Sequence, residues 1–273
     1  MINVPNLFTR SERTPSSAIA RFSIMLLSVG LLPIASTCMA DEPVQASSPA
    51  VSIGLGAIYA PKFSGADTYE TRAIPVLHVQ YGRFTLGGAN GLSYDFVKDD
   101  KFKAGVSLGY FRGRDESDAD YLQGLGDLDS GVDIGLYARR SFGAFYVAAN
   151  LKRDFSDDVG GVTGAASVGF AHRLSKRFLI NSGLRVRWMN ATHAQALYGV
   201  NAQQANLSAL PATTAKAGIE SGTLSLTALY FLNSSWTFTG SVSATQLMGD
   251  AKSSPITRDS QPTMIMASLS YRY

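Results

Sequence analysis

Long segments of this chain alternate apolar residues with small or polar ones, and this period of two constrains the fold most strongly. Successive side chains of a β-strand point to opposite faces, so each segment is predicted to be a strand with one apolar face. No apolar run after Asp41 is long enough for a membrane-spanning helix. The clearest alternations are Phe102, Ala104, Val106, Leu108 and Tyr110 against Lys103, Gly105, Ser107 and Gly109, and Ile180, Leu184, Val186 and Trp188 against Asn181, Gly183, Arg185 and Arg187.

The N-terminal residues have the composition of an export signal. Basic residues precede the apolar stretch Phe22–Ile34, which is too short to cross a bilayer as a helix. Small residues at Cys38 and Ala40 then fit a cleavage site. The alternative is a lipoprotein acylated at Cys38, although Ala35–Thr37 match that signal poorly.

The expected organisation is therefore a signal peptide over residues 1–40, a flexible periplasmic segment over 41–50 and a barrel over 51–273. Cys38 is the only cysteine, so the mature chain would have no disulfide and no thiolate chemistry. Removal of residues 1–40 leaves 21 basic and 20 acidic residues, so charge gives no argument for a nucleic-acid partner.

A soluble β-sandwich is the alternative to a membrane barrel, and three features weigh against it. The non-apolar face is rich in Gly, Ser and Thr, as a crowded or wet lumen would be. The strands reach about ten residues, which a tilted strand needs to cross hydrocarbon. The export signal also places the chain outside the cytosol. We predict an all-β, closed antiparallel transmembrane β-barrel in the outer membrane of a Gram-negative cell.

The spacing of the strands predicts short periplasmic turns and longer extracellular loops, as in bacterial outer-membrane barrels. The long connections are expected at 61–71, 113–131, 190–220 and 249–262. The count of twelve depends on splitting 83–97 at Ala89–Gly91; a single kinked strand there would give eleven. The expected strands are 51–60, 72–81, 83–89, 91–97, 102–112, 132–141, 144–154, 161–173, 178–189, 221–231, 235–248 and 263–273.

Aromatic residues flank the expected periplasmic turns and predict a girdle at the headgroup boundary. They include Tyr81, Phe84, Phe102, Phe145, Phe178, Tyr230, Trp236 and Tyr273. The chain ends with Leu269, Tyr271 and Tyr273 in alternation. This ending resembles the C-terminal signal by which the barrel-assembly machinery recognises its clients.

Short motifs along the mature chain occur in an order and spacing that is specific as a set. They are Tyr59–Asp67 with Tyr69, Arg72 and Pro75; Gly113–Glu116 followed by Leu122–Asp129; Arg153 and Asp154 with Gly160 and Gly161; Tyr198–Ala205; and Leu247–Ala251 with Ser254–Ile256, Arg258 and Asp259. The whole mature chain thereby resembles the MipA/OmpV family of outer-membrane proteins. It departs from the family at Gln123, often basic there, and at Val159, often His.

The resemblance implies a non-catalytic scaffold for peptidoglycan remodelling. Such a scaffold would join a lytic transglycosylase and a bifunctional penicillin-binding protein at the periplasmic face. The other expected partners are the lipid bilayer, lipopolysaccharide and the barrel-assembly machinery. Other family members are treated as porin-like or as surface proteins in host contact.

A narrow channel is the second hypothesis. Inward-facing charges would either pair and plug a small barrel or form a basic stripe that favours anions. The expected inward charges are Lys103, Asp133, Arg139, Lys152, Asp154, Arg185 and Arg187.

An enzyme is the third hypothesis, and the sequence gives it little support. No Ser or carboxylate lies at a spacing from His78, His172 or His193 that would indicate a catalytic triad. We therefore expect no catalytic, cofactor-binding or metal-binding residues. The acidic stretch around Asp115–Asp120 and Asp127–Asp129 reads as a solvated surface loop rather than a cation site. Within the longest loop, Gly199–Leu207 is predicted to form a short helix that folds over the barrel mouth.

Overall fold

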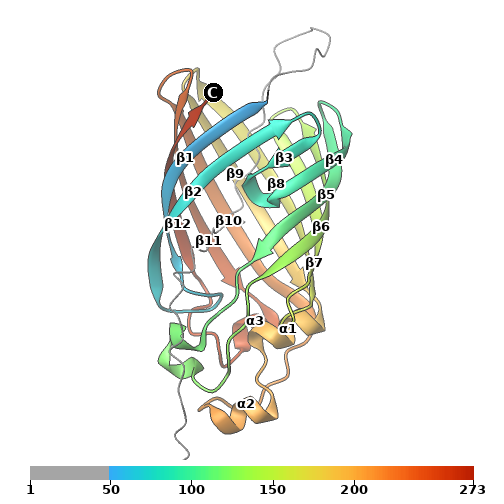
Figure 1. The fold of residues 1–273 in the computed structure, drawn as a ribbon, viewed down its shortest axis with the longest axis vertical. Helices are drawn as coiled ribbons and strands as arrows, with labels where there is room; N and C mark the ends of the chain where they lie inside the picture. Colours follow the sequence, from blue (N-terminus) through green and yellow to red (C-terminus); the bar gives the residue numbers. More distant parts are fainter. Residues whose placement is uncertain (1–48) are drawn as a thin grey trace, which may run out of the picture.

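The strands of this chain close into a single antiparallel β-barrel. The computed structural model describes residues 49–273, so the expected signal peptide and nearly all of segment 41–50 lie outside the described residues. Neighbours in sequence are neighbours in the wall, and β1 closes the barrel by pairing with β12, for example Leu55 with Leu269. Figure 1 shows the strands tilted across the barrel. The predicted fold class is therefore confirmed.

Twelve strands make up the wall, as predicted. They are β1 (Ala50–Pro61), β2 (Tyr69–Tyr81), β3 (Phe84–Leu86), β4 (Leu92–Lys98), β5 (Phe102–Phe111), β6 (Gly131–Phe142), β7 (Phe145–Asp154), β8 (Val162–Ser175), β9 (Phe178–Met189), β10 (Gly218–Phe231), β11 (Trp236–Leu247) and β12 (Thr263–Arg272).

The region 83–97 is two strands and not one, which settles the strand count. β3 pairs antiparallel with both β2 and β4, and the chain reverses between β3 and β4 through the 3-10 turn η1 (Gly88–Asn90). Gly87 makes this reversal possible: its φ is 107°, and a Cβ there would clash with the carbonyl oxygen of Leu77.

The two ends of the barrel differ. Both described termini and the short turns lie at one end, the short-turn end, and the long loops with all three α-helices lie at the other, the loop end (Figure 1). The helices are α1 (Ala191–Tyr198), α2 (Ala202–Leu207) and α3 (Gly249–Ser253). The predicted helix at 199–207 corresponds to α2, but α1 and α3 were not predicted. None of the helices described is long and apolar enough to cross a membrane.

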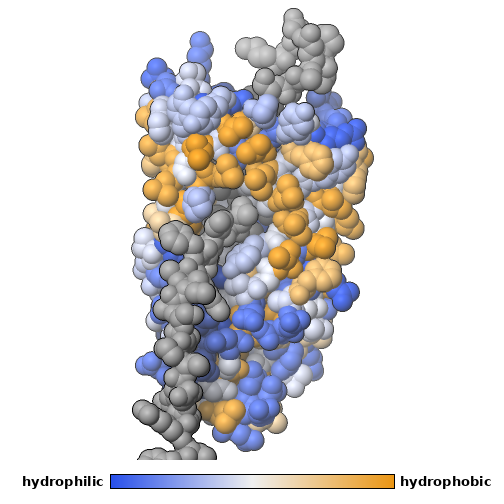
Figure 2. Space-filling view, viewed as in Figure 1, coloured by the Kyte–Doolittle hydropathy of each residue, from blue (hydrophilic) through white to orange (hydrophobic). Residues whose placement is uncertain are grey.

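The outer face of the wall carries exposed apolar side chains and the inner face small polar ones. Leu184 on β9 is 49% exposed, whereas Asn181 on the same strand is 5% exposed. Figure 2 shows an apolar band between two hydrophilic ends of the molecule. Exposure of so many large apolar side chains to water would be costly in free energy. This band is therefore a lipid-facing belt. At its short-turn edge lie exposed aromatic residues of the predicted girdle: Tyr81, Phe84, Phe145, Tyr230, Trp236 and Tyr273.

Candidate functional site

The loop end is covered by a packed layer of loops, which we call the mouth layer (residues 62–68, 112–130, 190–217 and 248–262). All four loops contribute to one apolar core. Phe63 comes from the β1–β2 loop, Leu122 from the β5–β6 loop and Ile256 from the β11–β12 loop. The same core contains Ala66, Leu125, Val200 and Leu210. Four of the five motif groups that carry the family resemblance thus contribute residues to this layer; the fifth, around Arg153 and Gly160, lies at the end of β7 and in the β7–β8 loop.

A fully buried tyrosine ties the mouth layer to the barrel wall. Tyr198, the last residue of α1, is 0% exposed, and its hydroxyl donates to Oε1 of Glu220 at 2.9 Å. The same hydroxyl is 2.7 Å from Oγ of Ser64 in the β1–β2 loop. Its backbone carbonyl accepts a hydrogen bond from Ser254 Oγ at 2.7 Å. Burial and the Glu220 charge raise the Tyr198 pKa well above its usual value, so the hydroxyl remains a donor.

Glu220 continues this network into the lumen. Its Oε2 lies 2.9 Å from Nε of Arg187 on β9. Sequence alternation missed Glu220, because the strand was expected to begin at 221 and its phase would turn residue 220 outward. A bulge between Ile219 and Ser221 in the β9–β10 pairing turns Glu220 inward. An acidic residue on an otherwise lipid-facing phase was the signal that could have revealed the bulge.

His193 is a buried residue of α1 that faces the lumen. Its backbone N–H donates to the N-cap Asn190 Oδ1 at 3.0 Å, and its ring Nε2 lies 3.3 Å from Arg187 Nη2. Burial, and secondly the positive charge of Arg187, lower its pKa to about 3. The imidazole is therefore neutral and accepts from the guanidinium.

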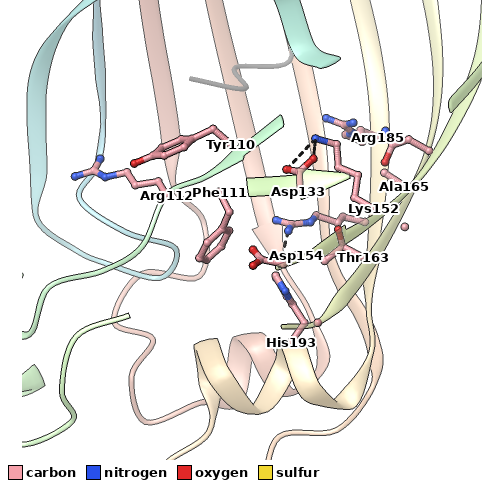
Figure 3. Close-up of a pocket in the computed structure, with 14 residues that line it drawn as sticks. Tyr110, Phe111, Arg112, Asp133, Lys152, Asp154, Thr163, Ala165, Arg185 and His193 are labelled. Atoms are coloured by element: carbon pink, nitrogen blue, oxygen red, sulfur yellow. Dashed lines mark hydrogen bonds and ion pairs between the residues drawn. The ribbon is translucent and has the colours of Figure 1, made fainter. Parts of the chain in front are cut away.

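Beneath α1 the lumen contains a cavity of about 200 Å³ lined by charged side chains from β6 to β9 (Figure 3). Lys152 Nζ pairs with Asp133 Oδ1 at 2.9 Å. Asp154 accepts from both the backbone and the hydroxyl of Ser156. Arg185 forms no ion pair within residues 49–273, and its Nε is buried without a hydrogen bond. This cavity thus combines ion pairs with two charged groups, Asp154 and Arg185, that form no ion pair within residues 49–273.

The structure gathers most of the predicted inward charges at this cavity. Asp133, Lys152, Asp154, Arg185 and Arg187 all line it. Arg139 lies elsewhere, with its guanidinium 3.7 Å from the centre of the Tyr146 ring. Lys103 on β5 is half-buried and does not line it. The charges of the lumen are therefore neither all paired nor arranged as a continuous basic stripe.

The histidines expected to be structural lie on separate elements: His78 on β2, His172 on β8 and His193 on α1. In the acidic loop, carboxylates brace the backbone, since Glu116 Oε2 accepts from the N–H groups of Gly124 and Gly126. No metal-binding group of three or more candidate ligands occurs among the described residues.

The short-turn end is strongly basic. Its exposed cations, which we call the basic rim, are Arg83, Lys101, Arg140, Arg173, Lys176, Arg177 and Arg272. The exposed acids there are Asp99 and Asp100. Asp99 accepts from the N–H groups of Lys101 and Phe102, which fixes that turn and lowers the Asp99 pKa.

The C-terminal residues lie on the outer edge of β12, at the short-turn end. Tyr271 packs between two other rings, 5.1 Å from Trp236 and 5.0 Å from Tyr273. Leu269 is exposed on the belt, and Tyr273 is 79% exposed.

Comparison with solved structures finds outer-membrane channels at low similarity. The NanC porin has 10% identity over 81% of this chain and 100% of its own, with a TM-score of 0.45. An outer membrane channel from Pseudomonas putida F1 has 9% identity over 86% and 100%, with a TM-score of 0.42. An anion-selective porin from Comamonas acidovorans has 8% identity over 83% and 99%, with a TM-score of 0.41. At these values the likeness says nothing about what this chain binds.

A search of curated proteins found no match to this chain. The model of the family described as MltA-interacting protein MipA matches residues 53–273, which span the mouth layer and all of the barrel except the first three residues of β1. The chain therefore belongs to the MipA family, and the predicted family is confirmed.

Proposed function

We propose that this outer-membrane barrel is a non-catalytic scaffold that holds a murein hydrolase and a murein synthase together at its periplasmic face. The family membership carries this proposal, since the family is named for interaction with MltA. The family and the fold are those of outer-membrane barrels rather than of enzymes. The partners proposed are a lytic transglycosylase and a bifunctional penicillin-binding protein.

The basic rim supports docking at the periplasmic end. In outer-membrane barrels the short turns face the periplasm. Exposed cations such as Lys176 and Arg177 would meet an acidic patch on a partner and speed its association. Small turns offer limited area, and a stable interface needs about 800 Å² per partner. The rim as a whole, rather than one turn, is thus the proposed contact surface.

Crosslinking in intact cells tests the scaffold. Cysteines replace Lys101 and Lys176 on the rim, and Lys252→Cys at the loop end serves as the control, all three being exposed. We expect the rim cysteines, and not the control, to capture cell-wall enzymes. Capture of no such enzyme, or equal capture by Lys252→Cys, would contradict the scaffold.

A narrow anion channel is the second candidate, because Arg185 in the lumen forms no ion pair with any residue of 49–273. The packed mouth layer favours the scaffold, since its core spans all four long loops. Planar-bilayer recording separates the two. We expect no conductance from the intact barrel, whereas steady unitary conductance steps would favour the channel.

The C-terminal residues Leu269, Tyr271 and Tyr273 are proposed as the barrel-assembly signal. Because Tyr273 is mostly exposed, Tyr273→Ala should cost the folded barrel little. We expect the variant to refold normally in detergent but to accumulate several-fold less in the outer membrane. Equal loss in both settings would mean a stability defect instead.

Residues 1–40 are proposed as a cleaved signal peptide, with 41–50 as a periplasmic extension. N-terminal sequencing of the protein from outer membranes tests this. A first residue of Asp41 is expected, and a mature chain that begins with acylated Cys38 would show a lipoprotein.

A further inference from the structure

The cavity beneath α1 retains one unpaired charge of each sign. Lys152, Arg187 and Arg112 line it, and each forms an ion pair with a carboxylate, so their charges are compensated. Asp154 and Arg185 also line it, and neither forms an ion pair within residues 49–273. The cavity as a whole is therefore close to neutral, but it offers both an anionic and a cationic contact.

The carboxylate of Asp154 lies at the α1 end of the cavity. Its Oδ1 accepts both the backbone N–H and the hydroxyl of Ser156, whereas its Oδ2 is buried with no hydrogen-bond partner in the described part of the chain. Its backbone N–H donates to the carbonyl of Gly161, and Gly161 lies directly against His193 of α1. A buried carboxylate oxygen without a donor matches a ligand that carries an ammonium group.

The imidazole of His193 adds a hydrogen-bond donor at the same end. Because its Nε2 accepts from Arg187, the hydrogen of the neutral ring is on Nδ1. This Nδ1 is buried with no hydrogen-bond partner among residues 49–273. A ligand that satisfies this end therefore carries an acceptor, such as a carbonyl oxygen, close to its ammonium group.

The guanidinium of Arg185 lies at the opposite end of the cavity from Asp154 (Figure 3). Arg185 pairs with Ser167 of β8, which pairs with Ala148 of β7. Asp154 is six residues further along β7, which is about 20 Å along the wall at about 3.3 Å per residue. The two side chains shorten this span without closing it. A single α-amino acid, with both charged groups on one carbon, is therefore too short to meet both residues.

The wall between the two ends is polar. Asn150 on β7 and Thr163 on β8 line the cavity, together with the ion pair of Lys152. An alkyl chain would desolvate these groups without replacing their hydrogen bonds, whereas peptide groups both donate and accept. An extended peptide advances about 3.3 Å per residue, so three residues reach about 10 Å. The cavity, at about 200 Å³, is smaller than the sites of drug-sized ligands, so small side chains fit it best.

We propose that this cavity binds a short zwitterionic peptide with small side chains. Its N-terminal ammonium would meet Asp154, and its C-terminal carboxylate would meet Arg185. The two charges fix the direction of the peptide, because the reverse orientation would bring like charges together. The Nδ1–H of His193 would donate to a carbonyl of the peptide. The site is independent of the scaffold, whose proposed contacts lie at the other end of the barrel.

Calorimetric titration of the mature protein in detergent tests the site, with trialanine as the probe. N-acetyl-trialanine lacks the ammonium, trialanine amide lacks the carboxylate, and alanine lacks the length. We expect trialanine to bind, and each of the other three to bind at least about tenfold more weakly. No detectable binding of trialanine, or equal affinity for either blocked peptide, would overturn the proposal.

Two variants assign the ends of the peptide. Asp154→Asn keeps the oxygen that accepts from Ser156, and it should remove the preference for trialanine over N-acetyl-trialanine while the preference over trialanine amide remains. Arg185→Gln should have the opposite effect. Asp157→Asn and Arg140→Gln remove the same charges at exposed positions and should leave both preferences unchanged.

Folding of each variant is checked by the change in gel mobility on boiling. A preference for the free amine that survives in Asp154→Asn, or one for the free carboxylate that survives in Arg185→Gln, would refute the proposed contacts. If either variant fails to fold, the other variant and the blocked peptides on the unmodified protein still decide the question.

Discussion

At the scale of single residues, the hydroxyl of Tyr198 joins the mouth layer to the wall. Tyr198→Phe removes its hydrogen bonds to Glu220 and Ser64, and we expect a loss of about 1–3 kcal/mol in the free energy of unfolding. Tyr121→Phe is the matched control, because the buried Tyr121 hydroxyl has no hydrogen-bond partner in the described part of the chain. Urea unfolding in detergent measures both. Similar losses for the two variants would contradict the assigned role of Tyr198.

His193 gives the mouth layer a pH dependence of defined sign. Its pKa of about 3 in the folded protein lies below the ordinary value of 6.5, so the unfolded chain binds more protons between these values. The stabilisation from this residue is complete above pH 6.5 and falls as the pH drops towards 3. Hydrogen exchange of the α1 amides should accordingly show weaker protection at pH 5 than at pH 7, after correction for intrinsic rates. His193→Gln should reduce this difference; an undiminished difference would assign it to another group.

At the scale of elements, the reversal between β3 and β4 depends on Gly87. Alanine there would adopt a φ of 107° and clash with the Leu77 carbonyl, so we expect Gly87→Ala to cost more than about 2 kcal/mol. Gly82 also has a positive φ, of 57°, but has open space around it. Gly82→Ala should cost about 1 kcal/mol. The urea midpoints of the two variants compare them, and equal shifts would show that the close approach at Gly87 does not matter.

The elements also show what could be predicted from the sequence. Alternation along β5 and β9 identified strands and faces, because each side chain meets either lipid or lumen. The site was harder to predict. Glu220 lies inward only because a bulge shifts the phase of β10, and α1 was missed because its packing against α3 and the wall depends on distant loops. How far β3 and β4 extend is likewise not specified by alternation.

At the scale of the whole molecule, charge is divided between the two ends. The basic rim occupies the short-turn end, whereas the loops at the other end carry many acids. The acids of the loop end include Asp115, Glu116, Asp118, Asp120, Asp127, Asp129, Asp157, Asp158, Asp250 and Asp259. Opposite charges on one barrel attract different partners to its two ends, and an acidic periplasmic protein would be steered to the rim.

Reversal of charge on the rim tests this steering. Lys176→Glu with Arg177→Glu should slow association of a purified lytic transglycosylase about tenfold at low salt, and less at physiological salt, because screening shortens the range of the field. The control carries Lys216→Glu and Lys252→Glu, two exposed lysines of the loop end, and has the same net charge. Surface plasmon resonance with the barrel in nanodiscs measures the rates. If the double variants slow association equally, net charge rather than the position of the rim governs the encounter, and the rim is not the docking surface.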